Sequence, residues 1–584
     1  MRLHPPVRVA EFRAAGWWGV PTWDRLFRDR TAERPDAVAL VDPPDKAAHL
    51  DAEALRLTWA ELDAYVDDLA CRLLAHGVGR GTVVGVQLPN SAELAAVYLA
   101  VHRLGGAVAP FPVQHREHEL GTLGAVAGLS AFVTATRVGK RAAAAAAREV
   151  YGDEVTVLAF GPARDLPDGV ASLDRGDAVG PDELARHISR FTADPGECVT
   201  VCWTSGTEAT PKGVPRCPDD WSPMALGSVD EAGLTGDDVL LNPFPMVNMA
   251  GIGGMFVPWL MTGATLVQHH PFDAGVFFEQ IAKERVTYTV VPPALLSTVL
   301  AHPALPEGAL GTLRVVGSGS APLTEAMTVG WADRFGIEVL NFFGSNEGAS
   351  LVAGPVTVPG HRDRAHYFPR FGSPTHTWRN RASHGMRTRL VDLATGAEVT
   401  APDTPGELRI KGPGVFSGYL PVPGRPDAFA EAFDDDGWFR TGDLFAYAAD
   451  AAGDPRYLRY VDRAKDIVVR GGMNISAAEL EGHLAGHPGV AECAVVGVPD
   501  PVLGERACAV VVPAPGADPP DLAGLVGYLR EIGIATYKLP ERLETVDALP
   551  RNPVGKVAKA ELRARFAAPA EDDSAPAVPP EEAP

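Results

Sequence analysis

The sequence predicts an α/β protein with a large N-terminal domain of mainly parallel sheets and a small α+β C-terminal domain. Two patterns support this prediction. Over most of the chain, helix-like segments alternate with short apolar runs typical of buried strands, which is the order found in parallel sheets. Between 477 and 566 the order becomes helix, strand, strand, helix, as expected for a separate compact domain.

The clearest alternation lies in the first 120 residues. Apolar residues recur every three or four positions over 59–75, which predicts a helix that ends before Gly77 and Gly79. The apolar run 83–88 (VVGVQL) then predicts a buried strand. Further helices and strands of this kind are expected at 92–104, 107–113, 288–291 and 313–316.

The charged segment 462–466 (DRAKD) is the expected boundary between domains. It separates an N-terminal domain over 20–462 from a C-terminal domain over 466–566. The last stretch, 567–584, is rich in Pro, Ala and acidic residues and has no Lys or Arg, so we expect it to be disordered.

Composition excludes several function classes. The formal net charge of −22 repels phosphate backbones and anionic lipid, so we expect neither nucleic-acid binding nor membrane insertion. Six cysteines are too few for a disulfide framework, and the N-terminus lacks the apolar core of a signal peptide, which predicts a cytoplasmic protein. Cys198, Cys202 and Cys217 lack zinc-site spacing and are interpreted as buried thiols.

A loop rich in small and hydroxyl residues, 204–214 (TSGTEATPKGV), follows a strand-like run at 198–203. Such a loop turns backbone N–H groups toward an anion, and Lys212 adds a positive charge, so it predicts a phosphate site. It is not a Walker loop, because Pro211 precedes the lysine and Gly213 follows it. An ordinary Gly-rich turn remains the alternative. The residues expected at the phosphates are Thr204, Ser205, Gly206, Thr207 and Lys212.

This string resembles the T-S-G-T-T-G-x-P-K-G signature of the adenylate-forming superfamily, which contains acyl-CoA synthetases, adenylation domains and luciferases. Glu208 and Ala209 replace the signature's Thr-Gly, a variant similar to that of fatty- and alicyclic-acid CoA ligases such as cyclohexanecarboxylate-CoA ligase. The resemblance extends over roughly residues 20–565. It implies a large adenylate-forming domain and a small C-terminal domain on a hinge.

Two further strings support the resemblance. The string 341–347 (NFFGSNE) is similar to the superfamily's aromatic-G-x-T-E motif, which implies that Phe343 stacks on adenine and that Glu347 binds Mg²⁺; Asn346 replaces the usual Thr. The string 319–322 (GSAP) resembles its adenine-side turn. The nucleotide contacts implied here are Gly319, Ser320, Ala321, Asn341, Phe342, Phe343, Gly344 and Asn346.

The resemblance also assigns residues near the domain boundary. The string 437–444 (GWFRTGDL) matches a motif whose aspartate, here Asp443, holds the ribose hydroxyls. Within the hinge segment, Arg463 is implied to reach the ribose and Lys465 to act as the pivot.

The C-terminal strings complete the implied active site. Gly471 and Gly472 are expected to line the tunnel for the CoA thiol, and Lys556, at the end of 550–556 (PRNPVGK), is expected to bridge the carboxylate and phosphate oxygens. The resemblance therefore implies ATP, Mg²⁺ and CoA as cofactors and cosubstrates. The implied catalytic residues are Thr204, Glu347 and Lys556.

The acid pocket is implied around the segment 242–251 (NPFPMVNMAG). No Asp stands there to bind an ammonium group, which disfavours amino acids, and Pro243 occupies the place of the Asn of hydroxyaryl-acid enzymes. The remaining side chains suit an aliphatic or alicyclic acid. The expected pocket residues are Val247, Asn248, Met249, Ser318 and Ser345.

We therefore predict an AMP-forming acyl-CoA synthetase, an acid–thiol ligase for a short- to medium-chain or alicyclic acid. One alternative transfers the adenylate to the phosphopantetheine of a free-standing acyl carrier protein, and another is an aryl-acid-CoA ligase. A third alternative is a non-catalytic binding module, which retention of Lys556, Glu347, Asp443 and Arg463 argues against.

Overall fold

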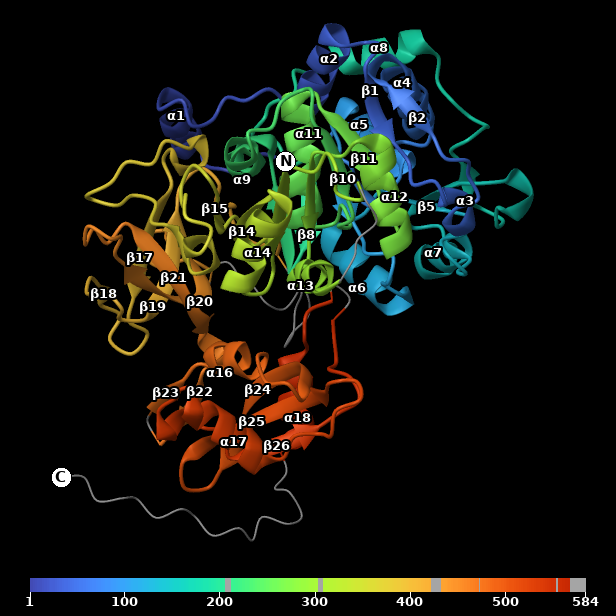
Figure 1. Cartoon of the computed structure of the whole chain (residues 1–584). Helices are drawn as coiled ribbons and strands as arrows, with labels where there is room; N and C mark the ends of the chain where they lie inside the picture. Colours follow the sequence, from blue (N-terminus) through green and yellow to red (C-terminus); the bar gives the residue numbers. More distant parts are fainter. Residues whose placement is uncertain (205–211, 303–307, 422–431, 472, 553–554, 568–584) are drawn as a thin grey trace, which may run out of the picture. The chain divides into compact units, whose positions relative to one another are not determined.

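The computed structural model describes residues 1–204, 212–302, 308–421, 432–471, 473–552 and 555–567 (Figure 1). Contacts between backbone positions divide these residues into two units. The first contains 1–204, 212–441 and 446–459, and the second contains 442–445 and 460–567. Each unit is described by itself.

An eight-stranded sheet forms the centre of the first unit, in the order β15-β14-β13-β12-β10-β11-β1-β2. Its strands are β1 (Val38–Val41), β2 (Arg56–Thr58), β10 (Val239–Asn242), β11 (Thr265–Gln268), β12 (Tyr288–Val291), β13 (Val315–Gly319), β14 (Glu338–Gly344) and β15 (Ser350–Ala353). Pairing is parallel from β14 to β1, and only the edge strands β2 and β15 run antiparallel.

A seven-stranded sheet lies beside it in the order β7-β6-β5-β3-β4-β8-β9. Its strands are β3 (Val83–Val86), β4 (Ala107–Pro110), β5 (Ala131–Ala135), β6 (Thr156–Phe160), β7 (Ala171–Ser172), β8 (Thr200–Trp203) and β9 (Gly213–Arg216). All pairs are parallel except β8 with β9. This confirms the predicted mainly parallel sheets.

The helices follow the predicted alternation. They are α1 (Pro6–Ala14), α2 (Trp23–Glu33), α3 (Lys46–His49), α4 (Trp59–Ala75), α5 (Ala92–Arg103), α6 (Glu117–Ala127), α7 (Ala143–Tyr151), α8 (Pro181–Ser189), α9 (Pro218–Ala232), α10 (Met249–Gly251), α11 (Val257–Thr262), α12 (Ala274–Glu284), α13 (Pro293–Ala301) and α14 (Glu325–Phe335). The bounds predicted for α4 are confirmed, because a capping box of Thr58 and Glu61 begins it. All twelve residues of α5 are buried, in a core that also contains Val84 of β3 and Leu240 of β10.

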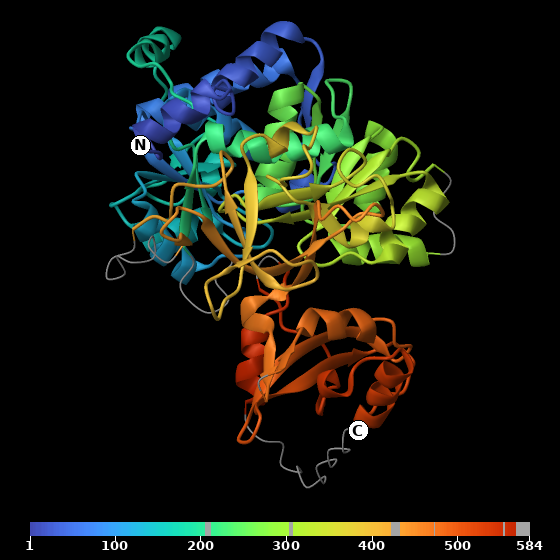
Figure 2. The ribbon, with the colours of Figure 1, turned by 90° about the vertical axis from the view of Figure 1, so that its left-hand side faces the viewer.

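A third sheet has the order β16-β21-β20-β19-β17-β18. Its pairs β16–β21, β17–β18 and β17–β19 are antiparallel. Its strands are β16 (Tyr367–Pro369), β17 (Arg387–Val391), β18 (Glu398–Val399), β19 (Gly406–Lys411), β20 (Phe439–Ala448) and β21 (Tyr457–Arg463). They are the yellow and orange strands at the left of Figure 1, which come nearest the viewer in Figure 2. Both β20 and β21 carry residues of the two units.

The second unit has a sheet in the order β23-β22-β25-β24, with β26 paired to β25. Its elements are η5 (Ala464–Asp466), β22 (Val468–Arg470), β23 (Met473–Ile475), α16 (Ala477–Leu484), β24 (Val490–Asp500), β25 (Gly504–Pro513), α17 (Leu522–Glu531), β26 (Arg542–Thr545) and α18 (Lys559–Phe566). The predicted order of helix, strand, strand, helix is confirmed. The tail predicted to be disordered lies, apart from its first residue, outside the described residues.

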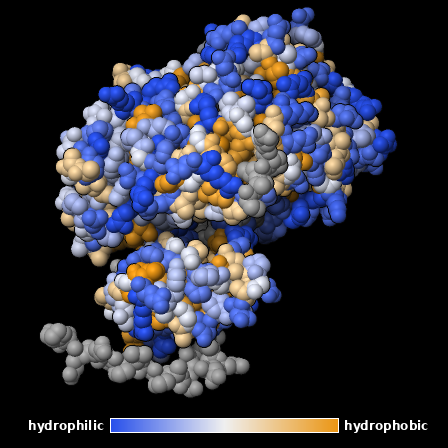
Figure 3. Space-filling view, viewed as in Figure 1, coloured by the Kyte–Doolittle hydropathy of each residue, from blue (hydrophilic) through white to orange (hydrophobic). Residues whose placement is uncertain are grey.

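Among the described residues, every helix is too short or too polar to cross a bilayer. The face drawn in Figure 3 carries apolar side chains in small groups among polar ones.

Candidate active site

The predicted phosphate loop joins two antiparallel strands, β8 and β9, whose register pairs Trp203 with Gly213. Thr204 and Lys212 close its base: the Thr204 N–H donates to the Lys212 carbonyl over 3.0 Å, and the Lys212 N–H donates to Thr204 Oγ1 over 2.9 Å. The threonine hydroxyl therefore holds the end of the loop that carries the lysine. Ser205, Gly206 and Thr207 lie outside the described residues.

Glu347, Tyr419 and Lys212 lie together beside this loop base. Tyr419 Oη donates to Glu347 Oε1 over 2.8 Å, and Lys212 Nζ lies 4.7 Å from the centre of the tyrosine ring. Burial and the neighbouring Glu347 charge raise the pKa of Tyr419, which keeps the phenol protonated and able to donate. Sequence reasoning missed Tyr419; its signal is a single tyrosine that ends the Gly-rich run 412–418.

Asn346 connects three parts of the site. Its Nδ2 donates to the Trp203 carbonyl over 2.9 Å, and its Oδ1 accepts from the Met249 N–H over 2.8 Å. Arg216 donates from Nη1 to the carbonyl of Asn346 over 2.6 Å. An amide has both a donor and an acceptor, so Asn346 ties the strand before the phosphate loop to the acid-pocket segment. Its predicted contact with the nucleotide stays a prediction.

The adenine-side residues meet through parallel pairing of β13 with β14, which places Gly319 opposite Phe342. A Cβ added at Gly319 would lie 2.4 Å from the Phe342 carbonyl oxygen, so this close approach requires glycine. Ser320 follows with φ +68°, and the turn continues to Ala321. β13 thus extends past the predicted strand at 313–316, because two neighbouring strands pair with its Gly-rich end.

The other residues of the aromatic motif have separate partners. The Asn341 amide donates from Nδ2 to the Arg364 carbonyl over 2.8 Å, so this amide group already has a partner within the protein. The Phe343 ring contacts the Phe368 ring edge-on at 6.1 Å. Phe342 faces the core. A Cβ added at Gly317 would lie 2.2 Å from Cε2 of the Phe342 ring, so the ring fills the space beside this glycine.

The predicted acid-pocket residues are buried or partly buried. Val247 is 7% exposed, and Met249 lies against Gly344, where an added Cβ would be 2.2 Å from the methionine Cε. Asn248 instead caps α10, because its Oδ1 accepts from the Ala250 N–H over 3.0 Å.

Two predicted pocket hydroxyls keep hydrogen-bonding capacity. Ser318 Oγ and Ser345 Oγ are both buried, and neither has a partner among the described residues. Buried hydroxyls are normally paired, so these two atoms could serve a ligand or an ordered water molecule.

In the second unit, Asp443 and Arg463, the two residues predicted at the ribose, lie close together. Arg463 Nε is 3.4 Å from Asp443 Oδ1. Asp462, which precedes the arginine, is buried and accepts from Ser476 Oγ over 2.8 Å and from the Ala478 N–H over 2.9 Å. It therefore fixes the start of α16 to the end of β21.

The predicted pivot Lys465 lies in η5, where its carbonyl accepts from Arg563 Nη2 over 3.0 Å. Gly471 adopts the left-handed region with φ +55°, and its N–H donates to the Leu503 carbonyl over 2.7 Å. Gly472 lies outside the described residues.

Asn552 holds the backbone of Lys556. The lysine N–H donates to Asn552 Oδ1 over 2.9 Å, and its carbonyl accepts from the Asn552 N–H over 2.8 Å. A bridge pairs Arg551 with Val557. These contacts fix the backbone on both sides of the lysine.

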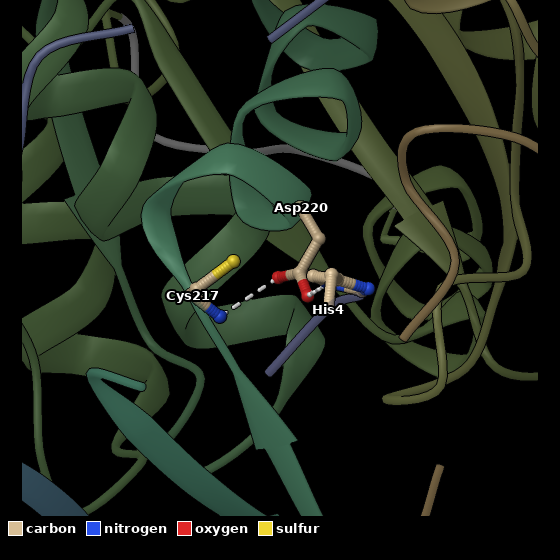
Figure 4. Close-up of side chains that lie close together, drawn as sticks. All are labelled: His4, Cys217 and Asp220. Atoms are coloured by element: carbon tan, nitrogen blue, oxygen red, sulfur yellow. Dashed lines mark hydrogen bonds and ion pairs between the residues drawn. The ribbon is translucent and has the colours of Figure 1, made fainter. Parts of the chain in front are cut away.

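The three cysteines interpreted as buried thiols are buried. Burial raises the pKa of Cys198 and of Cys202 to about 12, which keeps both as thiols. The third, Cys217, lies with His4 and Asp220 in a cluster whose potential metal-binding atoms are within 4.8 Å of one another (Figure 4). The sequence spacing did not indicate this cluster, because His4 is distant along the chain.

Comparisons with known proteins identify the family. A family model described as AMP-binding enzyme matches residues 27–420, and one described as AMP-binding enzyme C-terminal domain matches 479–556. A feruloyl-CoA synthase from Amycolatopsis sp is 31% identical over 513 residues, 87% of this chain and 94% of that protein. A salicyl-AMP ligase / salicyl-S-ArCP synthetase from Mycobacterium tuberculosis is 31% identical over 576 residues, 95% of this chain and 92% of that protein.

A comparison with solved structures agrees with these sequence matches. The crystal structure of ATP-bound MatB from Rhodopseudomonas palustris superposes with a TM-score of 0.74 at 27% identity, covering 94% of this chain and 99% of that one. The predicted membership of the adenylate-forming superfamily is therefore confirmed. The chain belongs to the AMP-binding enzyme family and is an acid–thiol ligase, which activates a carboxylic acid with ATP before joining it to a thiol.

Proposed function

We propose that this enzyme is an AMP-forming acyl-CoA synthetase for an apolar carboxylic acid, with Thr204, Glu347 and Lys556 acting on the reacting groups. The observation that supports this most directly is the cluster of Lys212, Tyr419 and Glu347 at the base of the phosphate loop. It offers a cation to phosphate oxygens and a carboxylate to a metal ion.

The chemistry explains why these groups are needed. A thiol cannot readily attack a carboxylate, because addition would place a second negative charge beside the first. In the first half-reaction the carboxylate oxygen bonds to the α-phosphorus of ATP, and pyrophosphate leaves. In the second, the CoA thiolate bonds to the carbonyl carbon, and AMP leaves with the electron pair. Fixed positive charges lower the barrier of the first step most, since its reactants are all anions.

Each predicted residue has a role in this scheme. Lys556 neutralises the attacking carboxylate and the α-phosphate, while Thr204 and Lys212 bind the departing phosphates. Asp443 and Arg463 hold the ribose, and their separation of 3.4 Å supports a shared site. Gly319, Ser320, Ala321 and the residues 341–344 surround the adenine.

Glu347 fits a magnesium ion. Its Oε1 accepts from Tyr419, whereas its Oε2 accepts from no donor among the described residues. A partly exposed carboxylate with one uncommitted oxygen is a usual magnesium ligand. When bound, the ion would screen the phosphate charges during the displacement.

The two half-reactions need different groups at one carbon. We propose that a C-terminal domain over 466–566 turns about Lys465 relative to an N-terminal domain over 20–462, so that Lys556 serves the first step and Gly471 and Gly472 serve the second. The carbonyl of Lys465 is bonded by Arg563, which also pairs with Asp466, so a rotation has to keep or exchange these contacts.

The acid is proposed to be aliphatic or alicyclic. The segment 242–251 carries no Asp or Glu, so the ammonium group of an amino acid would be buried without a partner. Val247 and Met249 offer apolar contacts. An aryl acid is the second candidate, favoured by the two unpartnered serine hydroxyls, which could bind one polar substituent.

The thiol is proposed to be CoA, in a cytoplasmic enzyme. Transfer to the phosphopantetheine of a free-standing carrier protein is the alternative, because one relative is named as a salicyl-S-ArCP synthetase.

A pyrophosphate-release assay tests the proposal, using acids from acetate to decanoate, cyclohexanecarboxylate, benzoate and phenylalanine, with and without CoA. We expect kcat/KM to rise up to about fourfold for each CH₂ that fits, from roughly 0.8 kcal/mol per buried methylene. Mass spectrometry should detect the acyl-CoA. A preference for phenylalanine, or adenylate without thioester when CoA is present, would contradict the proposal.

A further inference from the structure

The backbone of residues 412–420, here named the Glu347 loop, determines where Glu347 lies. The Phe416 N–H donates to the Glu347 carbonyl over 2.9 Å, and Tyr419 bonds to its carboxylate. At the next residue, Gly348, an added Cβ would be 2.0 Å from the Gly414 carbonyl oxygen, so the two backbones are in direct contact. A shift of the loop would therefore move the carboxylate.

The N-terminal segment holds this loop from its other side. Arg8 on α1 donates from Nη2 to the Gly412 carbonyl over 3.0 Å and to the Val415 carbonyl over 2.9 Å. Trp18 donates from Nε1 to the Pro413 carbonyl over 3.0 Å. Two side chains from the beginning of the chain thus bind three carbonyls about 400 residues later.

Arg216 completes the set. Its fully buried guanidinium donates from Nη2 to the Gly414 carbonyl over 2.9 Å and from Nη1 to the Asn346 carbonyl. Its Nε donates to Asp220 Oδ1 over 2.9 Å, and Asp220 Oδ2 lies 3.1 Å from His4 Nε2 (Figure 4). Four consecutive carbonyls, from 412 to 415, are therefore all bound by long-range side chains.

The cluster of His4, Cys217 and Asp220 belongs to this arrangement and is not a metal site. Both oxygens of Asp220 already have partners, and the buried Arg216 beside it would repel a cation. His4 instead anchors the start of the N-terminal segment to the carboxylate that orients Arg216.

We infer that His4, Arg8 and Trp18, together with Arg216, form a buttress that positions Glu347 and Tyr419 for binding of MgATP. Arg8 is then a positioning residue for the reaction, although it lies before residue 27, where the match to the AMP-binding enzyme model begins. The inference rests on the role proposed for Glu347.

Two measurements on Arg8→Ala test this inference. Hydrogen exchange of a peptide covering 412–420 should become faster, because two charge-assisted hydrogen bonds are lost. Calorimetry should show MgATP binding weakened about tenfold, the loss expected for hydrogen bonds of this kind. AMP lacks the β- and γ-phosphates, so its affinity should change less than about twofold. In Arg8→Lys the ammonium group can reach one carbonyl, so both measurements should lie between those of Arg8→Ala and those of the unaltered enzyme.

Arg2→Ala is the matched control. Arg2 lies in the same segment but is exposed and pairs with Asp194, away from the loop, so this variant should change neither measurement. If Arg8→Ala does not fold, Trp18→Phe is the second variant: it removes the bond to the Pro413 carbonyl together with part of a buried ring that contacts His4, Phe12 and Arg8, and should show the same effects at smaller size.

Unchanged exchange of 412–420 would overturn the inference, and so would faster exchange with unchanged MgATP affinity. Equal weakening of MgATP and AMP would also overturn it, because general loss of structure would act on both. Failure of the proposed function is distinguishable: the unaltered enzyme would then fail to release pyrophosphate with any acid, whereas the exchange measurement needs no turnover.

Discussion

Glu347 in the first unit is predicted to bind the metal ion at the phosphates and Arg463 in the second to bind the ribose of the same nucleotide, yet their surroundings differ. Glu347 is held through Tyr419, through its own carbonyl and through a loop in which the carbonyls of 412 to 415 are bonded by side chains. Arg463 has a side chain 41% exposed. We therefore expect the groups proposed for the phosphates and the metal ion to be fixed before the substrates bind, and the groups near the proposed hinge to exchange contacts between the two half-reactions.

The strongest test of this contrast is Lys556→Ala. If the lysine serves only the first half-reaction, acid-dependent pyrophosphate release should fall about a thousandfold, because a charge at the reacting oxygens is lost. Synthetic acyl-adenylate with CoA should still give the thioester at nearly the original rate. Equal loss in both assays would show that Lys556 does not serve the first half-reaction alone.

Glu347→Gln tests the fixed side of the comparison. The amide keeps the size but loses the charge, so kcat/KM should fall about a hundredfold and recover partly at higher Mg²⁺. Tyr419→Phe, which removes only the hydrogen bond to Oε1, is the matched variant and should show a smaller loss in the same direction. A loss that is independent of Mg²⁺ would argue against the metal role.

Asp443→Ala sharpens the assignment of the ribose. Since ATP and AMP carry the same ribose, both should bind about tenfold more weakly, as expected for loss of hydrogen bonds to a charged group. Titration calorimetry with each nucleotide measures this. An unchanged affinity for AMP would remove Asp443 and Arg463 from the ribose site.

The smallest effect on turnover is expected from Glu231→Gln in α9. Burial raises the pKa of Glu231 to about 7. The N–H groups of Val356 and Thr357 donate to its carboxylate and favour the charged form, but the effect of burial is larger. Between the ordinary carboxyl pKa and this value, the folded protein keeps a proton that the unfolded chain releases. The free energy of unfolding should therefore fall as pH rises across that interval, by roughly 3 kcal/mol in total.

In Glu231→Gln this pH dependence should disappear, and the variant should gain stability above pH 7 relative to the parent chain. Denaturant unfolding from pH 4 to 8, followed by a probe in each unit, measures it. A slope that persists, or that lies in the second unit, would contradict the assignment.

Much of the fold was predictable because it depends on short-range rules. The bounds of α4 follow from its apolar periodicity and from Thr58 and Glu61, which act within one turn. The end of β13 was not predictable in the same way. Gly317 and Gly319 are typical of a turn by composition, but pairing with β12 and β14 makes them part of the strand. The Phe342 ring occupies the space that a side chain would need at Gly317, and the Phe342 carbonyl oxygen occupies it at Gly319.

The sequence by itself determined the class of chemistry: motifs at 204–214, 341–347, 437–444 and 550–556 predicted an adenylate-forming enzyme, and the family models matched over 27–420 and 479–556 confirm that family. Tertiary structure alone decided which groups hold those residues in place. The contacts of Tyr419 with Glu347 and of Asn346 with Trp203 and Met249 join segments far apart in the chain. No local rule specifies such contacts, because they depend on how sheets and loops pack once each element has formed.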